Sequence, residues 1–518
     1  MAYNADSEVS LIAAATQFLM SSLWSRAVLL VLVSCLIVNE IKYHQRTPAN
    51  VLPVRFPAVY LPLISSWIAA ARFMRDPSGS LREAMAQSKN GLLRIATLQG
   101  EFILVTDRHK VAEYLRAPDT VLNAQDGSND QQQIPFTMGY GVGHRTYHTA
   151  VVRGPVTQKI VPNTPMMLDE ASRAFDDLIG APDEETPIPL YGVIAMTVAR
   201  IANRIYVGTE LCRNQEFLRN ATDYAEAVVL SAEILRIFPE WMKRFVVQIL
   251  PVTFYRRQGR RWLGPLIQDR LDGKKADDLI QWLIDAAPPI ERTVPQLAER
   301  IMALNVASIH TTTMTFTAAL YTLAAEPTKY VSALREEVMA NLEEGKITAS
   351  TLSKLPKMES FLRESGRINT LGLMAMQRNA RREFRFSDGT VIPPGAKLGS
   401  PSLFLHRDPA VHENPEAFDW LRFYHPPPQA QDDGTPTETV QAKPKTMLNT
   451  DTNFHLFGHG RHPCPGRYLA VHEMKLMFAL LLLRYNIQLV PGTAPQPFFI
   501  GTMPIPDTKL EVLFTTRR

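Results

Sequence analysis

The segment Phe457-Gly458-His459-Gly460-Arg461-His462-Pro463-Cys464-Pro465-Gly466 is the most informative part of this 518-residue chain. It places Cys464 after a glycine-rich turn and directly before an apolar helical run, residues 468–483. A thiol at a helix N-terminus faces unpaired backbone N–H groups and the positive end of the helix dipole, and both favour thiolate over thiol. The glycines permit a tight backbone and the close approach of a flat ligand. The segment therefore predicts a thiolate that is presented as the axial ligand of a haem.

Two other uses of this cysteine compete with the haem ligand. A lone cysteine is most often a buried structural residue. Alternatively, Cys- and His-rich tracts often bind zinc, and the zinc candidates here are His455, His459, His462 and Cys464. A zinc site does not need three glycines around its ligands, so the pattern favours haem.

The same segment resembles the haem-binding signature of the cytochrome P-450 family, Phe-x-x-Gly-x-Arg-x-Cys-x-Gly. The matching residues are Phe457, Gly460, Cys464 and Gly466, whereas His462 stands where the family usually has Arg. In the family this position bonds a haem propionate, and an imidazole N–H can still donate one hydrogen bond. The resemblance covers roughly residues 45 to 518. It implies a haem b cofactor with Cys464 as the axial ligand of the iron, and a mainly α fold with small β-sheets behind an N-terminal transmembrane helix.

The composition fits one large catalytic domain. The chain is 46% hydrophobic, and its 55 basic and 51 acidic residues give a net charge of +4, which is too small to indicate nucleic-acid binding. Three cysteines do not make a disulfide framework and fit a reducing compartment. The densest basic patch, Arg256 to Arg261, is a solvated helix face or a membrane-surface contact, because the neighbouring residues 238–251 are apolar.

Residues 11–38 are apolar apart from small polar residues, Gln17 and Arg26, and are long enough to span a bilayer. A cleaved signal peptide is the alternative, but the first ten residues contain no basic residue. Lys42 and Arg46 follow the span and place that side in the cytoplasm. We expect a membrane anchor with its flank in residues 1–45 and a haem domain in residues 46–518. The resemblance to microsomal family members implies a single-pass protein of the endoplasmic reticulum membrane with a cytoplasmic catalytic domain.

Local patterns predict a predominantly helical domain. Long apolar or amphipathic runs indicate helices, and Gly-, Asn-, Asp- and Pro-rich stretches indicate loops. The predicted helices are residues 108–115, most of 147–287, then 293–325, 329–343 and 353–369. The predicted strands are two in 92–105, a pair in 381–399, and one each in 487–490 and 510–515. The predicted long loops are residues 123–143 and 425–449.

Glu364 and Arg367 have the i, i+3 spacing that places two side chains on one helix face. This spacing recurs along the chain and by itself indicates only a solvated helix face. The resemblance implies more, because the family joins such a pair to an Arg in a later Phe-x-x-x-Arg-Phe-like segment. Phe418-Asp419-Trp420-Leu421-Arg422-Phe423 supplies Arg422. A buried Glu between two Arg side chains is costly to break, so we expect a structural role beneath the haem.

Ala307-Ser308-Ile309-His310-Thr311-Thr312 lies in the predicted long helix. Thr311 matches the family threonine that helps deliver protons during oxygen activation. Its hydroxyl can bond the carbonyl of Ala307 and loosen the helix over the haem. The family carries an acid where this chain has His310, and an imidazole can also shuttle protons near neutral pH. Without Cys464, the same stretch indicates only a packed core helix.

Two arginines are further candidates for binding haem carboxylates. Arg378 stands just before the predicted strand pair, and Arg153 lies in the helical stretch 148–160. Both positions resemble propionate-binding positions of the family. Arg153 lacks the Trp that often stands four residues earlier, where this chain has Thr149. A surface arginine is the alternative for both.

The resemblance implies a haem-thiolate monooxygenase most like fungal secondary-metabolite members. It uses O2 and electrons from NADPH through NADPH-cytochrome P-450 reductase, and inserts one oxygen atom into a bulky apolar substrate, such as a terpenoid. One alternative is a non-oxygenating or peroxide-driven haem-thiolate enzyme, an isomerase or dehydratase. The presence of His310 at the usual acid position favours this alternative. Another is a membrane-anchored metal or haem carrier without catalysis. The expected substrate lining is Asn305, Ser308, Ile309, Leu371, Leu373, Met374, Ile500, Gly501 and Thr502.

Overall fold

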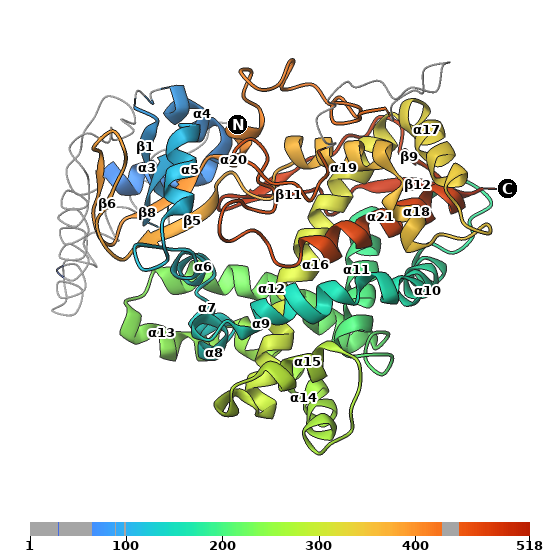
Figure 1. Cartoon of the computed structure of the whole chain (residues 1–518), viewed down its shortest axis with the longest axis horizontal. Coiled ribbons are helices and arrows are strands. Elements are labelled where there is room, and N and C mark those ends of the chain that lie inside the picture. Colours follow the sequence, from blue (N-terminus) through green and yellow to red (C-terminus); the bar gives the residue numbers. More distant parts are fainter. Residues whose placement is uncertain are drawn as a thin grey trace, which may run out of the picture.

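The computed structural model describes Leu30, residues 65–426 and residues 445–517, except positions 87, 89, 98 and 99. These residues form a mainly helical body with small sheets, as predicted (Figure 1). The predicted transmembrane segment, apart from Leu30, and most of the predicted loop 425–449 lie outside the described residues. Within the described part of the chain, no helix has both the length and the apolar composition needed to cross a bilayer.

The long helix α16, Val294–Ala325, runs through the centre of the body. Thr293 is its N-cap and a proline stands in its first turn, which is a favoured start because the missing N–H would have no helical partner. Pro327 begins the next helix, α17, Pro327–Ala340, and so ends α16 nearby. The predicted helix 293–325 is confirmed almost to the residue.

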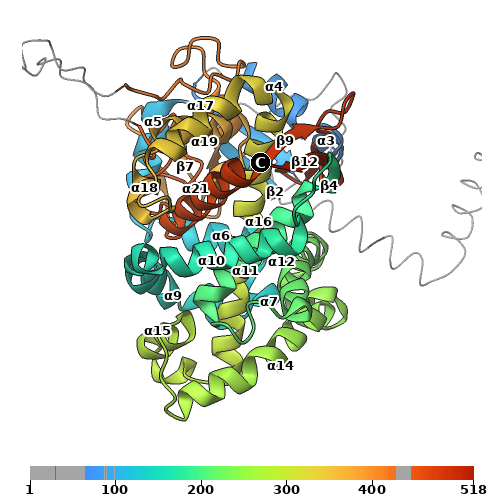
Figure 2. The ribbon, with the colours of Figure 1, turned by 90° about the vertical axis from the view of Figure 1, so that its right-hand side faces the viewer.

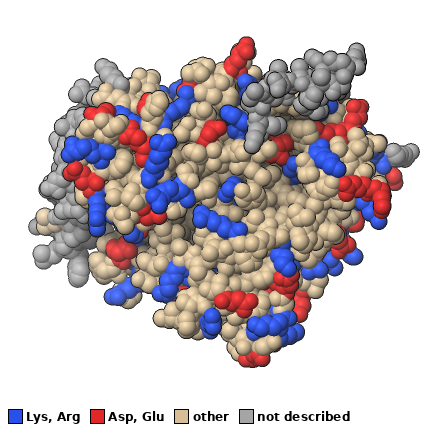
Figure 3. All heavy atoms as spheres, viewed as in Figure 1, with Lys and Arg blue, Asp and Glu red and all other residues tan. Residues whose placement is uncertain are grey.

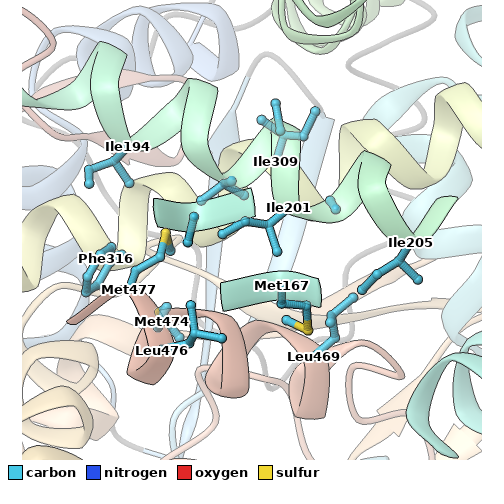
Figure 4. Packing of buried hydrophobic residues seen from close by; sticks show 14 of the residues in the cluster. Met167, Ile194, Ile201, Ile205, Ile309, Phe316, Leu469, Met474, Leu476 and Met477 are labelled. Carbon is cyan, nitrogen blue, oxygen red and sulfur yellow. The ribbon is translucent and has the colours of Figure 1, made fainter. Parts of the chain in front are cut away.

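The main core is formed by four helices: α11 (Leu190–Tyr206) and α21 (Arg467–Arg484) pack on α16, and α10 (Ile160–Leu178) packs on α11 and α21. Figure 4 shows apolar side chains of the four helices pointing toward one another, among them Ile201, Ile309 and Met477. Each fully buried side chain of this kind contributes about 1.5–3 kcal/mol. The core therefore fixes the position of α21 in the fold, and with it the position of the cysteine segment that precedes this helix.

The helices α14 and α15 lie at one end of the body and the sheets at the other, in both views (Figures 1 and 2). α12 packs on α14, and both pack on α16. The other helical segments of the described chain are α3 Ser65–Arg75, α4 Pro77–Ala86, α5 Arg108–Arg116, α6 Ala124–Gln132, α7 Ile134–Thr137, α8 Tyr140–His144, α9 Tyr147–Val151, the π-helical turn Val152–Val156, α12 Gln215–Arg236, α13 Glu240–Val246, the 3-10 turn Val247–Ile249, α14 Pro251–Leu271, α15 Leu279–Ala286, the 3-10 turn Pro289–Glu291, α18 Ala349–Ser353, α19 Pro356–Ile368 and α20 Ser402–His406.

The largest sheet has the strand order β1-β2-β8-β5-β3. β1 and β2 form the predicted antiparallel hairpin, and β8 joins β2 in parallel. The terminal strand β12 lies between β4 and β9, antiparallel to both. The strands are β1 Leu92–Thr97, β2 Gly100–Val105, β3 Leu122–Asn123, β4 Thr186–Pro189, β5 Ala375–Ala380, β6 Phe384–Arg385, β7 Val391–Ile392, β8 Lys397–Ser400, β9 Tyr485–Leu489, β10 Phe498–Ile500, β11 Met503–Ile505 and β12 Glu511–Thr516.

The prediction of a long loop at residues 123–143 is wrong, because this stretch contains α6, α7 and α8. Asn123 caps α6 by accepting a hydrogen bond from the backbone N–H of Asp126, at 2.7 Å. α6 packs against β5, and a Cβ on Gly127 would lie 3.0 Å from the carbonyl oxygen of Gln377. Tertiary packing and capping thus outweigh the low helix propensity of these residues.

The predicted Glu364–Arg367–Arg422 cluster is confirmed on α19. Arg367 donates two hydrogen bonds to the Glu364 carboxylate, at 2.8 and 2.9 Å, and Arg422 donates to it from the other side at 3.1 Å. Glu364 and Arg367 are fully buried. The remaining N–H groups of Arg367 bind backbone carbonyls of His406, Pro415 and Ala417. The cluster therefore ties α19 to the segment that follows α20.

Glu364→Ala should lower the free energy of unfolding by about 3–5 kcal/mol, because it leaves buried arginine charge without its partner. The matched control is Lys329→Ala, which removes an exposed i, i+3 ion pair with Glu326 (2.7 Å) and should cost less than about 1 kcal/mol. Urea unfolding of both variants measures the difference. Equal, small losses would contradict the structural role of the buried cluster.

Candidate active site

Cys464 ends a closed loop in front of α21. Its backbone N–H donates to the carbonyl oxygen of Phe457 at 2.7 Å, which draws the two ends of the segment together. Gly458 and Gly460 lie in the left-handed region, with φ of 69° and 77°. A Cβ on Gly460 would also lie 3.0 Å from the Cβ of Leu115. The loop can close in this way only with glycine at these two positions.

The Cys464 thiol lies in an environment that suits a metal-bound thiolate. Burial raises the pKa of the thiol, whereas the backbone N–H groups of Gly466 and Arg467 and the charges of Arg467 and Arg153 act in the opposite direction. The predicted effect of the helix start is therefore present but smaller than that of burial. The N–H groups of Gly466 and Arg467 and the nearby arginine charges favour the thiolate, which is the form of cysteine that binds a metal ion.

The alternative zinc site is not formed. His455 is buried, and its Nε2 lies 3.1 Å from the Ser402 hydroxyl. His459 lies 3.2 Å from the Thr450 hydroxyl through Nδ1, and the His462 Nε2 lies 2.8 Å from the Asp119 carboxylate. In the part of the chain that the structure describes, no three His, Cys, Asp or Glu side chains are grouped as a metal site. The glycine-rich loop thus presents the cysteine alone.

The middle of α16 forms the second wall of the site. Ala307 is exposed there, although it lies halfway along the central helix of the fold. The Thr311 hydroxyl donates to the Ala307 carbonyl at 2.7 Å, as predicted. Tyr206 links the two walls, because its hydroxyl is within hydrogen-bonding reach of Ser308 and its pKa also responds to the charge of Cys464. The face of α16 at Ala307, Ser308 and Thr311 carries no charged side chain, which suits an apolar neighbour.

His310 points out of the predicted acid–alcohol arrangement toward two other helices. Its Nε2 lies 3.0 Å from the carbonyl oxygen of Thr222 on α12, and its Nδ1 lies 3.3 Å from the Tyr191 hydroxyl on α11. A carbonyl only accepts, so Nε2 carries the proton and Nδ1 of the neutral ring accepts from Tyr191. Because His310 points elsewhere, the half-buried Thr311 is the residue that places a hydroxyl beside Ala307.

The candidate propionate ligands fit a group with two carboxylates. Arg378 is only 5% exposed, and burial lowers the pKa of its guanidinium. Among the described residues it forms no ion pair, and it donates only to the neighbouring Gln377 carbonyl at 2.8 Å. Arg153 is exposed in the π-helical turn, close enough for its charge to lower the pKa of Cys464. A buried cation that lacks a carboxylate partner is what a haem propionate would satisfy.

Two residues of the expected substrate lining face elsewhere. Asn305 is fully buried, and its carbonyl oxygen accepts from the Asn203 amide on α11 at 2.7 Å. Ile309 is fully buried in the main core (Figure 4). Leu371 and Leu373 do line a cavity of about 510 Å³, together with Met314 and other largely apolar side chains. Apolar space therefore lies behind α16, one turn beyond Thr311.

Four residues near the site were not predicted: Asp119, Tyr191, Tyr206 and Glu473. Asp119 and Tyr191 carry no local signal, because their partners are 343 and 119 positions away. Glu473 could have been found, since it is an acid within the apolar helical run after Cys464. Burial raises the pKa of its carboxyl to about 8, so the group is largely neutral at pH 7.

Comparisons with known proteins agree with this site. The Cytochrome P450 family model matches residues 130–514. Cytochrome P450 monooxygenase 71 of Postia placenta is 30% identical over 88% of this chain and 91% of the relative. Ent-kaurene oxidase of Gibberella intermedia is 28% identical over 90% of this chain and 87% of the relative. The solved structure of retinoic acid bound cyanobacterial CYP120A1 has a TM-score of 0.66 over 86% of this chain and 96% of that chain, at 17% identity, and so shares the fold.

The family match covers most of the chain, and the glycine-bearing cysteine loop, the Glu364–Arg367–Arg422 cluster and the Thr311 helix all lie within it. The chain therefore belongs to the cytochrome P450 family and is an oxidoreductase, a haem-dependent monooxygenase that oxidises an organic substrate with O2 and electrons from a redox partner.

Proposed function

We propose that this monooxygenase inserts one oxygen atom into a bulky apolar substrate, a terpenoid or a related secondary metabolite. The observation that carries the proposal is the Cys464 loop together with an uncharged helix wall at Ala307, Ser308 and Thr311. A charged substrate would lose its solvation in such a site without gaining a partner. The terpenoid class is supported by relatives that are ent-kaurene oxidases.

The cavity behind α16 supports a bulky substrate. Its volume is about 510 Å³, and Met314 and Ala318 line it from the helix face that also carries Ala307 and Thr311. Leu371 and Leu373 line the same cavity from the segment after α19. Most of the lining is apolar and selects substrates by size and shape, while three charged side chains also line the cavity, Glu326, Arg407 and Asp507.

The haem in this proposal is haem b. Cys464 would bind its iron through the thiolate, Arg378, Arg153 and His462 would bind its carboxylates, and Phe457, Gly460 and Gly466 shape the loop. When bound, the haem supplies oxygen activation. We assign proton delivery to Thr311, whose hydroxyl lies beside Ala307 on α16, and to His310 through its contact with the Tyr191 hydroxyl, although no hydrogen bond joins the two side chains among the described residues.

The proposed electron donor is NADPH-cytochrome P-450 reductase, and the proposed location is the endoplasmic reticulum membrane. Residues 1–45 act as a single-pass anchor, and residues 46–518 form the cytoplasmic haem domain. A second membrane contact is supported by exposed apolar residues between the end of α12 and the start of α14. We call these residues the apolar segment: Leu230, Ile237, Trp241, Phe245, Ile249 and Phe254. Elsewhere the charges of both signs are interspersed, as Figure 3 shows for one face, which fits no nucleic-acid partner.

Cys464→Ala should abolish the thiolate-type carbon monoxide difference spectrum of the reduced protein and all activity, because no other described cysteine can replace the ligand: Cys212 is buried among Glu170 and arginines. Cys212→Ala is the control and should keep the spectrum. A thiolate-type spectrum in Cys464→Ala would disprove the assignment.

Thr311→Ala should bind haem and substrate normally but release reduced oxygen as hydrogen peroxide. Proton-transfer groups contribute about 10²–10⁴-fold, so product per NADPH should fall by at least about tenfold. Thr315→Ala is the control, because its hydroxyl makes the same bond to the preceding turn, at 2.8 Å, but is buried. Unchanged coupling in Thr311→Ala would remove Thr311 from proton delivery, and full coupling in His310→Asp would show that His310 substitutes for the usual acid.

A panel of terpenoids, fatty acids and polyketides tests the substrate class through substrate-induced shifts in the haem spectrum. We expect the tightest binding and NADPH-dependent oxygen consumption with a neutral polycyclic terpenoid, because its shape fills an apolar cavity. Tight binding confined to linear chains with a carboxylate would rule out the terpenoid assignment. Product formation without oxygen consumption would rule out the monooxygenase reaction.

A further inference from the structure

Arg300, near the start of α16, joins several separate segments of the chain. It is 1% exposed, and its Nη2 donates to the carboxylate of Glu291 at 2.7 Å and to the carbonyl oxygen of Gly141 at 3.0 Å. Its Nη1 lies 2.7 Å from Nδ1 of His148 on α9. The Cζ of Arg300 also lies 4.0 Å from the centre of the Tyr147 ring. One buried side chain thus connects α16 with α8, α9 and the 3-10 turn that precedes α16.

His148 is the acceptor in this arrangement. Burial and the charge of Arg300 lower the pKa of the imidazole to about 4, so the ring is neutral at pH 7. A guanidinium only donates, so Nδ1 accepts and the proton of the neutral ring is on Nε2. Arg145, just before α9, also binds the buried carboxylate of Glu291. The segment that leads into α9 is therefore tied to α16 through one buried carboxylate and through the imidazole.

The residues after α9 hold their own backbone weakly. α9 continues into the π-helical turn Val152–Val156, in which Arg153 is followed by Gly154 and Pro155. Glycine is the least restricted residue, and proline has no N–H for a helical hydrogen bond. Such π-helical turns within helices are frequent at functional sites. The position of Arg153 therefore depends on the neighbouring helices, and on its N-terminal side that helix is α9.

The π-helical turn lies against the cysteine loop, because a Cβ on Gly466 would lie 3.9 Å from Cγ1 of Val152. On α16, Arg300 and Ala307 are seven residues apart, which places them on one face of the helix, about 10 Å apart along its axis. The same face of α16 thus carries the wall of the site and, two turns earlier, the attachment of α9.

We propose that Arg300 is a positioning residue for the haem: through its bond to His148 it fixes α9 and the π-helical turn, so that Arg153 meets a haem carboxylate. This inference rests on the proposed role of Arg153 as a carboxylate ligand, and it names what holds that ligand in place. A side chain on a fixed turn loses less conformational freedom on binding than one on a mobile turn.

The test follows haem loss from the holoenzyme to excess apomyoglobin, and the bending modes of the haem propionates in resonance Raman spectra. His148→Leu removes the acceptor. It should speed haem loss about tenfold, as expected for the loss of one charge-assisted hydrogen bond, and shift a propionate mode as Arg153→Ala does. His148→Asn offers an oxygen near the place of Nδ1 and should restore both readouts. Arg300→Lys retains the ion pair with Glu291 but lacks the fork that also reaches His148, so it should act like His148→Leu.

His144→Leu is the control, because His144 is exposed on α8 and its Nδ1 lies 3.0 Å from the Tyr140 carbonyl oxygen of its own helix. It should change neither readout. The double variant His148→Leu/Arg153→Ala separates positioning from general destabilisation, since residues that act through one another are not additive. Its haem loss should equal that of Arg153→Ala alone.

Three results would overturn the proposal. Additive effects in the double variant would show that His148 acts by destabilising the fold. Unchanged readouts in both His148→Leu and Arg300→Lys would show that this attachment does not position the turn. No change in Arg153→Ala would remove Arg153 as a carboxylate ligand, and the inference with it. Because neither readout needs substrate or turnover, a failed oxygenase assignment would leave these outcomes unaffected.

Discussion

The structure depends on one constraint: the Cys464 thiol must be half-buried and still be presented to a ligand. Cys464 meets it on a loop closed by its own backbone N–H, which bonds the Phe457 carbonyl. The closure requires left-handed backbone at Gly458 and Gly460, and Leu115 leaves no room for a side chain at Gly460. The loop is then held from below, where a Cβ on Gly366 of α19 would lie 2.7 Å from Leu456. The buried Glu364 cluster of the same helix fixes this floor.

The opposite wall depends on packing rather than on special backbone. α11 and α21 pack on α16, with α10 behind them, and bury Ile309 and Phe316 (Figure 4). Ala307 on the same helix remains exposed. The exposed face of the helix thereby carries a small residue, Ala307, and a back-bonded threonine, Thr311. Two of its other polar side chains bond between helices: Asn305 binds Asn203, and His310 lies between Tyr191 and Thr222. The same core that gives the domain its stability thus sets the distance available to a flat cofactor.

Helices and strands could be predicted from the sequence wherever a local residue pattern specified them. The helices 293–325 and 468–483 are long apolar runs, and the β1–β2 hairpin has two apolar strands on either side of a Gln-Gly turn. The stretch 123–143 was not predictable, because its helices form through the Asn123 cap and packing on β5. The orientation of α16 was also not predictable. In a helix that is apolar on all sides, the sequence does not show whether Asn305 or Ala307 lies on the exposed face. Contacts such as His462 with Asp119 depend on the tertiary fold alone.

X-ray absorption at the iron edge of the purified protein tests the central claim most directly, because it identifies the atoms bound to the metal. The account predicts one haem iron per chain with a single sulfur ligand, and the loss of that sulfur in Cys464→Ala. Iron with only nitrogen and oxygen ligands, or zinc in place of iron, would contradict it.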